Sequence, residues 1–212
     1  MIIIDDYLND NILIEIKQDK TFSQNLPYKY WEGGYWNNKS DSNVKSLISK
    51  LFTNRLIDEI CNSITGEGKF YPENYNGVEY WINVLTTDTN KESVSTEENL
   101  ALDYHTDKDE DLLKQQGIFR GPNFGCVFYY DSLIDKVEGG YLKVFENVGT
   151  NEKGLFNIEA MKNKQPMVIT PKFNRMIFFS PGKDLHCVTP VINGTRTALA
   201  INFWKTKPVD YA

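Results

Sequence analysis

Apolar residues in the first third of the chain recur at the three- and four-residue spacing of amphipathic helices. A first short helix is expected over residues 11–17, with Asp10 or Asn11 as its N-cap. A longer apolar stripe follows, made of Val44, Leu47, Ile48, Leu51, Phe52, Leu56, Ile57, Ile60 and Ile64. Gly66 then provides a natural end to the helix. The pattern predicts a helical lead-in over residues 1–77.

From about residue 78 the pattern changes to short runs of β-branched and aromatic residues separated by turn residues. These runs cover residues 80–86, 100–106, 125–130, 141–145, 167–170, 175–179, 187–191 and 197–204. Such a series of strands after helices is typical of a double-stranded β-helix, or jelly roll, supported by N-terminal helices. We therefore expect a mainly β fold and a single domain over residues 1–212, with a jelly-roll catalytic core at residues 78–206.

The composition narrows the range of functions. A chain of 212 residues can bury a full hydrophobic core, and 41% hydrophobic and 25% charged residues are typical of a globular protein. The formal net charge of −6 disfavours nucleic acid as a partner, because nucleic-acid binding normally requires a basic surface. The three cysteines are odd in number and lack paired spacing, which indicates a reducing environment rather than a disulfide framework.

The opening of the chain and its apolar runs bear on its location. The first residues, Met-Ile-Ile-Ile-Asp-Asp, lack the basic and long apolar regions of a signal peptide. No apolar run reaches the length of about 18 residues that a transmembrane helix needs. We expect a cytoplasmic protein without a membrane partner.

The only two histidines, His105 and His186, give the sequence its main chemical signal. Strand alternation places Asp103, His105 and Asp107 on one face, so His105 and Asp107 project in the same direction. Two imidazoles and one carboxylate form the ligand set of non-haem Fe(II) oxygenases, although zinc also accepts these ligands. The alternative interpretations are a polar edge-strand residue for His105 and a core histidine for His186.

Arg196 lies ten residues after His186, beyond an Asn-Gly turn. Its guanidinium offers a rigid fork suited to a carboxylate, which a site that binds a dicarboxylate would need. Taken alone, Arg196 could equally be a surface cation on a strand.

From about residue 78 to residue 204 the chain resembles the Fe(II)- and 2-oxoglutarate-dependent dioxygenases, and within them the prolyl 4-hydroxylase-like branch. The segments that carry the resemblance are residues 105–107, 127–130, 139–145, 171–179 and 186–204, together with the opening Ile-Ile-Asp-Asp-Tyr-Leu. Three of these blocks are specific when they occur in this order: His-Thr-Asp, Gly-Gly, and the histidine followed by an arginine.

The resemblance implies roles for individual residues. His105, Asp107 and His186 would be the iron ligands, and Arg196 would pair with the distal carboxylate of 2-oxoglutarate. The phenol of Tyr130 would hydrogen-bond the same carboxylate, while an aromatic side chain packed in a strand remains an equal alternative. Gly139 and Gly140 would turn the chain back into the sheet, because glycine has wider backbone freedom.

The implied function is hydroxylation of an unactivated C–H bond with release of succinate and CO2, and a prolyl residue of a peptide or protein is one candidate substrate. Fe(II), 2-oxoglutarate and O2 would be required, and ascorbate is a further candidate. Asp107 favours hydroxylation over halogenation, since halogenating relatives lack the ligand carboxylate. Nucleic-acid demethylases often carry a second arginine six positions after the first, but Asn202 occupies that position here.

Two alternatives stay open at this stage. The substrate could be a free amino acid or another small metabolite, or the chain could be a non-catalytic metal-binding jelly-roll module. Substrate contacts are expected in the loops at residues 86–99, taken as a mobile entrance loop, and 108–121, which follow no recognisable motif. The sequence leaves the oligomeric state open.

Overall fold

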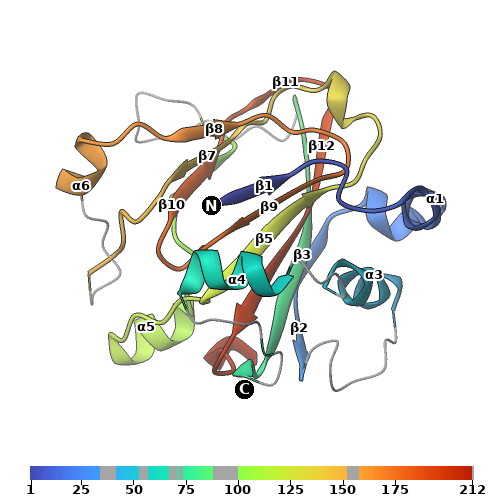
Figure 1. The fold of residues 1–212 in the computed structure, drawn as a ribbon. Coiled ribbons are helices and arrows are strands. Elements are labelled where there is room, and N and C mark those ends of the chain that lie inside the picture. Colours follow the sequence, from blue (N-terminus) through green and yellow to red (C-terminus); the bar gives the residue numbers. More distant parts are fainter. Residues whose placement is uncertain are drawn as a thin grey trace.

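The computed structural model describes residues 1–33, 42–52, 57–66, 71, 74–87, 100–151 and 158–211. Within these residues two antiparallel sheets face each other, and three helices cover the outer face of the larger sheet (Figure 1). The mainly β fold class expected from the sequence is therefore confirmed.

The larger sheet has the strand order β1-β9-β5-β12-β3-β2. Its strands are β1 (Ile2–Ile4), β2 (Leu26–Glu32), β3 (Gly77–Thr86), β5 (Phe124–Tyr129), β9 (Arg175–Phe179) and β12 (Thr195–Trp204). The smaller sheet has the order β4-β10-β7-β8. It consists of β4 (Leu102–His105), β7 (Leu142–Phe145), β8 (Met167–Ile169) and β10 (Leu185–Val188). A further pair joins β6 (Glu138–Gly139) to β11 (Val191–Asn193).

The winding of the chain identifies the jelly roll. From β3 the chain passes to β4 in the smaller sheet, returns to β5, crosses to β7 and β8, returns to β9, crosses to β10 and returns to β12. Apart from β7 and β8, which are neighbours in the smaller sheet, the strands from β3 to β12 named here alternate between the two sheets, as is typical of the double-stranded β-helix. β12 lies in the middle of the larger sheet between β5 and β3, and it pairs with β3 along all ten of its residues.

The helices differ from the expected pattern in their boundaries. The helical segments are α1 (Asp10–Gln18), η1 (Lys20–Ser23), α3 (Asn43–Leu51), α4 (Ile57–Thr65), α5 (Glu110–Gln116), η4 (Ile134–Lys136), α6 (Ile158–Lys162) and η5 (Val209–Tyr211). Asn9, rather than Asp10 or Asn11, caps α1, because its side chain accepts the N–H of Ile12 at 3.2 Å. The long apolar stripe forms α3 and α4, and Leu56 lies outside the described residues.

Two apolar cores lie on the two faces of the larger sheet. Along β12, Leu199, Ile201 and Phe203 face the core shared with α1, α3 and α4. Ala198 and Ala200 alternate with them and face the core between the two sheets. The larger sheet is therefore covered on both sides, and the side chains that face the smaller sheet line the interior of the jelly roll.

One predicted loop contains a helix. Within residues 108–121, α5 begins after Asp109, whose side chain accepts the N–H of Leu112 at 3.0 Å, and ends at Gly117 with a positive φ of 68°. Of the other predicted loop, residues 88–99 lie outside the described residues. The described helices include none that is long and apolar enough to cross a membrane.

Candidate metal centre

His105 and His186 are direct cross-strand partners. β4 pairs antiparallel with β10, and the register sets His105 opposite His186. Side chains that are opposite each other in an antiparallel pair lie on the same face, and the two imidazole rings are 4.3 Å apart between centroids. The pairing of these two short strands therefore brings the two histidines together across 81 residues of sequence.

Both imidazoles are oriented by backbone carbonyls. Nδ1 of His105 donates to the carbonyl of Asp103 at 2.6 Å, and Nδ1 of His186 donates to the carbonyl of Asp184 at 2.9 Å. A carbonyl can only accept, so the proton resides on Nδ1 and the lone pair on Nε2 is free for a metal. Burial, and then the neighbouring His105, lowers the pKa of His186 to about 4, so His186 is neutral at physiological pH.

Asp107 completes the cluster from the segment that follows β4. Its Oδ1 lies 3.6 Å from Nε2 of His105 and 3.8 Å from Nε2 of His186. The N–H of Asp107 donates to the carbonyl of Pro181 at 2.9 Å. Close packing fixes this segment, because a Cβ on Gly121 would lie 2.7 Å from Cα of Gly182 and 2.9 Å from the carbonyl oxygen of Asp107.

The donor set and its spacing fit a divalent metal ion. The ligand atoms of His105, Asp107 and His186 all lie within 4.8 Å of one another. Metal–ligand bonds of about 2.1 Å at right angles place two donor atoms ~3 Å apart, so the distances of 3.6 and 3.8 Å from Oδ1 of Asp107 to the two Nε2 atoms would each shorten by less than about 1 Å on metal binding. Two imidazoles and one carboxylate on one side would leave the opposite coordination positions open, which is the arrangement used by non-haem Fe(II) oxygenases.

Arg196 is a buried cation on β12. Its side chain is only 3% exposed. Nε donates to the carbonyl of Gly140 at 3.0 Å and Nη2 donates to the hydroxyl of Tyr129 at 3.0 Å. Among the described residues no carboxylate forms an ion pair with this guanidinium. A buried charge without a counter-ion is costly, so Arg196 is suited to receive a carboxylate from a ligand.

Gly139 and Gly140 make room for this arrangement. Both have positive φ, 78° and 63°. A Cβ on Gly139 would lie 2.2 Å from the carbonyl oxygen of Pro190, and one on Gly140 would lie 2.9 Å from Cδ of Arg196. Only glycine permits both the backbone conformation and the close approach.

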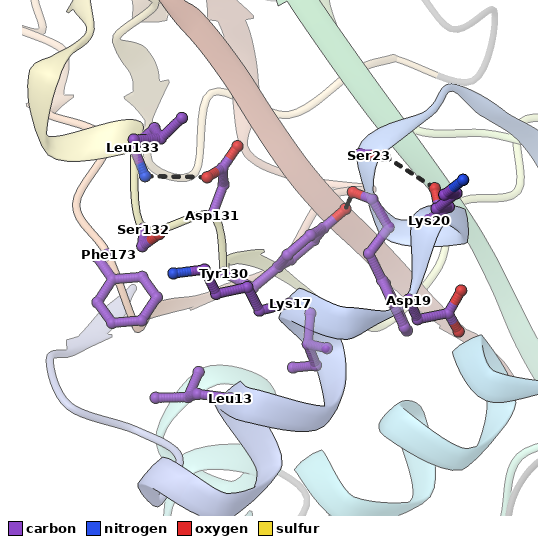
Figure 2. A pocket seen from close by; sticks show the side chains of 12 residues that line it. Leu13, Lys17, Asp19, Lys20, Ser23, Tyr130, Asp131, Ser132, Leu133 and Phe173 are labelled. Carbon is purple, nitrogen blue, oxygen red and sulfur yellow. Dashed lines mark hydrogen bonds between the residues drawn. The ribbon is translucent and has the colours of Figure 1, made fainter.

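The structure corrects the expectation for Tyr130. Its side chain points to the helix-covered face of the larger sheet, where its hydroxyl donates to the carbonyl of Phe22 at 2.7 Å. Tyr130 lines a surface pocket of about 300 Å³. Figure 2 shows it there beside Leu13 and Lys17 of α1. The neighbouring Tyr129 makes the contact with Arg196 instead. Side chains alternate along β5, so a displacement of one residue exchanges the two faces.

The comparisons with known proteins agree with this geometry. Residues 94–204 match the sequence model of the 2OG-Fe(II) oxygenase superfamily. The chain belongs to this superfamily. No curated protein sequence matches the chain.

Solved structures show the same fold at low sequence identity. A prolyl 4-hydroxylase from Phytophthora capsici has a TM-score of 0.53 and 13% identity, and the match covers 95% of this chain and 57% of that protein. A prolyl-4-hydroxylase from Pseudomonas putida has a TM-score of 0.51 and 11% identity, with 97% and 92% covered. HygX from Streptomyces hygroscopicus, solved with nickel and 2-oxoglutarate bound, has a TM-score of 0.50 and 11% identity, with 96% and 81% covered.

As a member of the superfamily, the protein is a dioxygenase that uses Fe(II), 2-oxoglutarate and O2. Its jelly roll is similar in fold to those of the prolyl 4-hydroxylases.

Proposed function

We propose that the protein hydroxylates an unactivated C–H bond, and that its substrate is a prolyl residue of a peptide or protein. The observation that carries the hydroxylase assignment is the cluster of His105, Asp107 and His186 together with the buried and carboxylate-free Arg196. Succinate and CO2 are the products formed from 2-oxoglutarate.

Different residues of the chain bind the metal ion and the co-substrate. His105, Asp107 and His186 hold Fe(II) on one side and leave its other positions to the co-substrates. Arg196, steadied by Tyr129 and the carbonyl of Gly140, pairs with the distal carboxylate of 2-oxoglutarate. The bound Fe(II) and 2-oxoglutarate supply the oxidising chemistry, by which one oxygen atom of O2 enters succinate and the other enters the substrate.

The strand that carries Arg196 leaves space for the co-substrate. On the same face of β12, the next two side chains are the methyl groups of Ala198 and Ala200. Asn83 pairs with Ala198, and its Oδ1 is buried without a hydrogen-bond partner. A buried acceptor without a partner is rare and is commonly satisfied by a bound molecule, which supports a ligand beside Asn83.

An aromatic pair supports a peptide substrate. Trp81 of β3 packs against the inter-sheet core, and its ring lies 4.6 Å from that of Tyr28, which is 60% exposed. Trp81 faces Ala200, on the metal-site side of the larger sheet. Exposed aromatic rings beside a site provide apolar surface for a pyrrolidine ring or a peptide backbone. The similarity in fold to prolyl 4-hydroxylases also favours this substrate class.

The first experiment tests the co-substrate chemistry. The protein is incubated with Fe(II), 2-oxoglutarate and O2, and succinate is measured beside a reaction with Zn(II). We expect succinate to form in the reaction with Fe(II) and not in the reaction with Zn(II). For Arg196→Met we expect the 2-oxoglutarate concentration that gives half-maximal succinate formation to rise by about 100-fold, because a buried charge-assisted contact is lost. Failure to form succinate under any condition would favour a non-catalytic module.

The second experiment tests the substrate. Proline-containing peptides, their proline-to-alanine counterparts and free amino acids are incubated with the complete system and analysed by mass spectrometry. Addition of one oxygen atom to a prolyl residue supports the proposal. Oxidation of free amino acids or other metabolites without oxidation of any peptide would move the assignment to a small-molecule hydroxylase.

A further inference from the structure

The two oxygens of Asp107 meet different surroundings. Oδ1 is the oxygen that approaches both histidine Nε2 atoms, at 3.6 and 3.8 Å. Oδ2 accepts a hydrogen bond from Nδ2 of Asn202 at 2.9 Å. Asn202 lies on β12 with its side chain inside the jelly roll and is 2% exposed. The buried amide therefore holds the oxygen that does not face the histidines.

The orientation of the Asn202 amide is defined by its neighbours. Nδ2 also donates to Oε2 of Glu79 at 3.3 Å. Two carboxylates can only accept when ionised, so the NH2 group of the amide must face them and its oxygen must point away. That oxygen lies towards Gly125, where a Cβ would be only 2.6 Å from it. Gly125 thus provides the space in which the amide adopts this orientation.

Glu79 is held in turn by two further donors. The indole N–H of Trp204 donates to Oε2 at 3.1 Å, and the hydroxyl of Tyr211 donates to Oε1 at 2.8 Å. Glu79 and Asn202 are direct partners in the pairing of β3 with β12. A continuous series of hydrogen bonds therefore runs from Tyr211 in η5 through Glu79 and Asn202 to Asp107.

We propose that Asn202 is a positioning residue that keeps Asp107 a one-oxygen ligand, and that Glu79 orients Asn202 for this role. The inference rests on the metal site of the proposed function. By holding Oδ2, the amide prevents the carboxylate from turning to bind the ion with both oxygens. The position that a second oxygen would occupy then stays open for co-substrates.

The test measures Fe(II) binding directly, by anaerobic titration of the 212-residue chain, without reference to turnover. Asn202→Leu keeps a side chain of similar size but replaces the amide by an apolar group. We expect its Fe(II) affinity to fall by about 10- to 100-fold, the usual effect of losing a hydrogen bond that orients a metal ligand. Asn174→Ala is the matched control, because Asn174 is also buried and bonds the backbone of Leu8 rather than any metal ligand.

Two substitutions at Glu79 provide an independent measurement. Glu79→Gln keeps an oxygen that can accept from Asn202, and we expect Fe(II) affinity within about 3-fold of the original protein. Glu79→Leu removes the acceptor, and we expect a loss of about 5- to 10-fold that does not add to the loss in Asn202→Leu. Equal losses in Glu79→Gln and Glu79→Leu would contradict the orienting role of Glu79.

The outcomes separate this inference from the proposed function. If the original protein does not bind Fe(II), the metal site itself is wrong. If the original protein binds Fe(II) and both Asn202→Leu and Glu79→Leu bind it equally well, the metal site stands and the positioning role is refuted. A parallel loss of Fe(II) affinity in Asn174→Ala would also refute it, since the effect would then reflect general loss of stability.

Discussion

Arg196 and Tyr129 are linked by a buried hydrogen bond of 3.0 Å between Nη2 and the phenolic oxygen, although 67 positions separate them in the sequence. The centre of the guanidinium also lies 5.1 Å from the centre of the Tyr129 ring. Tyr129 sits on β5 and Arg196 on β12, and these strands are neighbours in the larger sheet. The aromatic side chain therefore limits the positions that the guanidinium can take.

Removing the phenolic oxygen of Tyr129 should weaken co-substrate binding. Tyr129→Phe keeps the ring and loses one hydrogen bond, which corresponds to about a 2- to 10-fold rise in the dissociation constant of 2-oxoglutarate. Tyr130→Phe is the matched control, because its hydroxyl bonds the carbonyl of Phe22 on the other face. Titration of both variants with 2-oxoglutarate in the presence of Fe(II) measures the effect, and equal losses would exclude the assigned role of Tyr129.

A methyl group at Gly140 should displace Arg196. Gly140→Ala would place a Cβ 2.9 Å from Cδ of Arg196 in addition to the strain of a positive φ. Gly149→Ala carries the same strain at φ 66°, but its Cβ would meet no atom within 4 Å. Gly149→Ala should lose about 1 kcal/mol of stability in urea denaturation and Gly140→Ala more than that, and Gly140→Ala alone should lose 2-oxoglutarate affinity. Retention of full affinity in Gly140→Ala would contradict the close contact.

Metal binding should stabilise the folded protein through the three ligands. At an Fe(II) concentration of about 100 times the dissociation constant, the free energy of unfolding should rise by about 2.7 kcal/mol under anaerobic conditions. His105→Ala should abolish most of this increase. Asp103→Ala should retain it, because His105 bonds the backbone carbonyl of Asp103 and not its side chain. Thermal denaturation with and without metal gives the comparison.

The buried Glu79 predicts a pH dependence of stability. Burial, offset in part by the hydrogen bond from Tyr211, raises the pKa of Glu79 from 4.5 to about 6. Between these two values the folded protein binds more protons at this position than the unfolded chain does, so this residue makes stability fall as the pH rises. Glu79→Gln lacks this contribution. The unfolding free energy of Glu79→Gln minus that of the original protein should therefore increase from pH 4.5 to pH 7. Urea titrations of both proteins at several pH values measure this difference. A difference that stays constant with pH would argue against the raised pKa.

The sequence pointed to the candidate metal ligands, which the structure brings together, because the chain has only two histidines and one of them precedes an aspartate at strand spacing. It could not predict the register that sets His105 opposite His186, because pairing between distant strands depends on the whole sheet. The sequence suggested Tyr130 as a ligand of the co-substrate, with a packed aromatic side chain as the equal alternative, and did not point to Tyr129. Both residues suit a buried strand, and only the tertiary packing decides which one faces Arg196.

The sequence carries signals for the two ends of helix α5 but not for its interior. Asp109 and Gly117 are typical N-terminal and C-terminal residues of a helix, yet the seven residues between them lack a strong apolar pattern. Asn202 had no local signal at all, because its partners Asp107 and Glu79 are 95 and 123 positions away. Contacts of this kind follow from the winding of the jelly roll rather than from any short segment.

The position of β4 at the edge of the smaller sheet has a consequence for how the site assembles. This strand is four residues long, and among the strands that the structure describes it pairs with β10 alone. A slip of one residue would turn His105 to the other face and destroy the triad. Fe(II) can bind only when β4 is correctly aligned, so bound Fe(II) would shift the equilibrium towards the aligned form and make opening of this strand rarer. Amide hydrogen exchange in β4 should therefore slow when the ion is present.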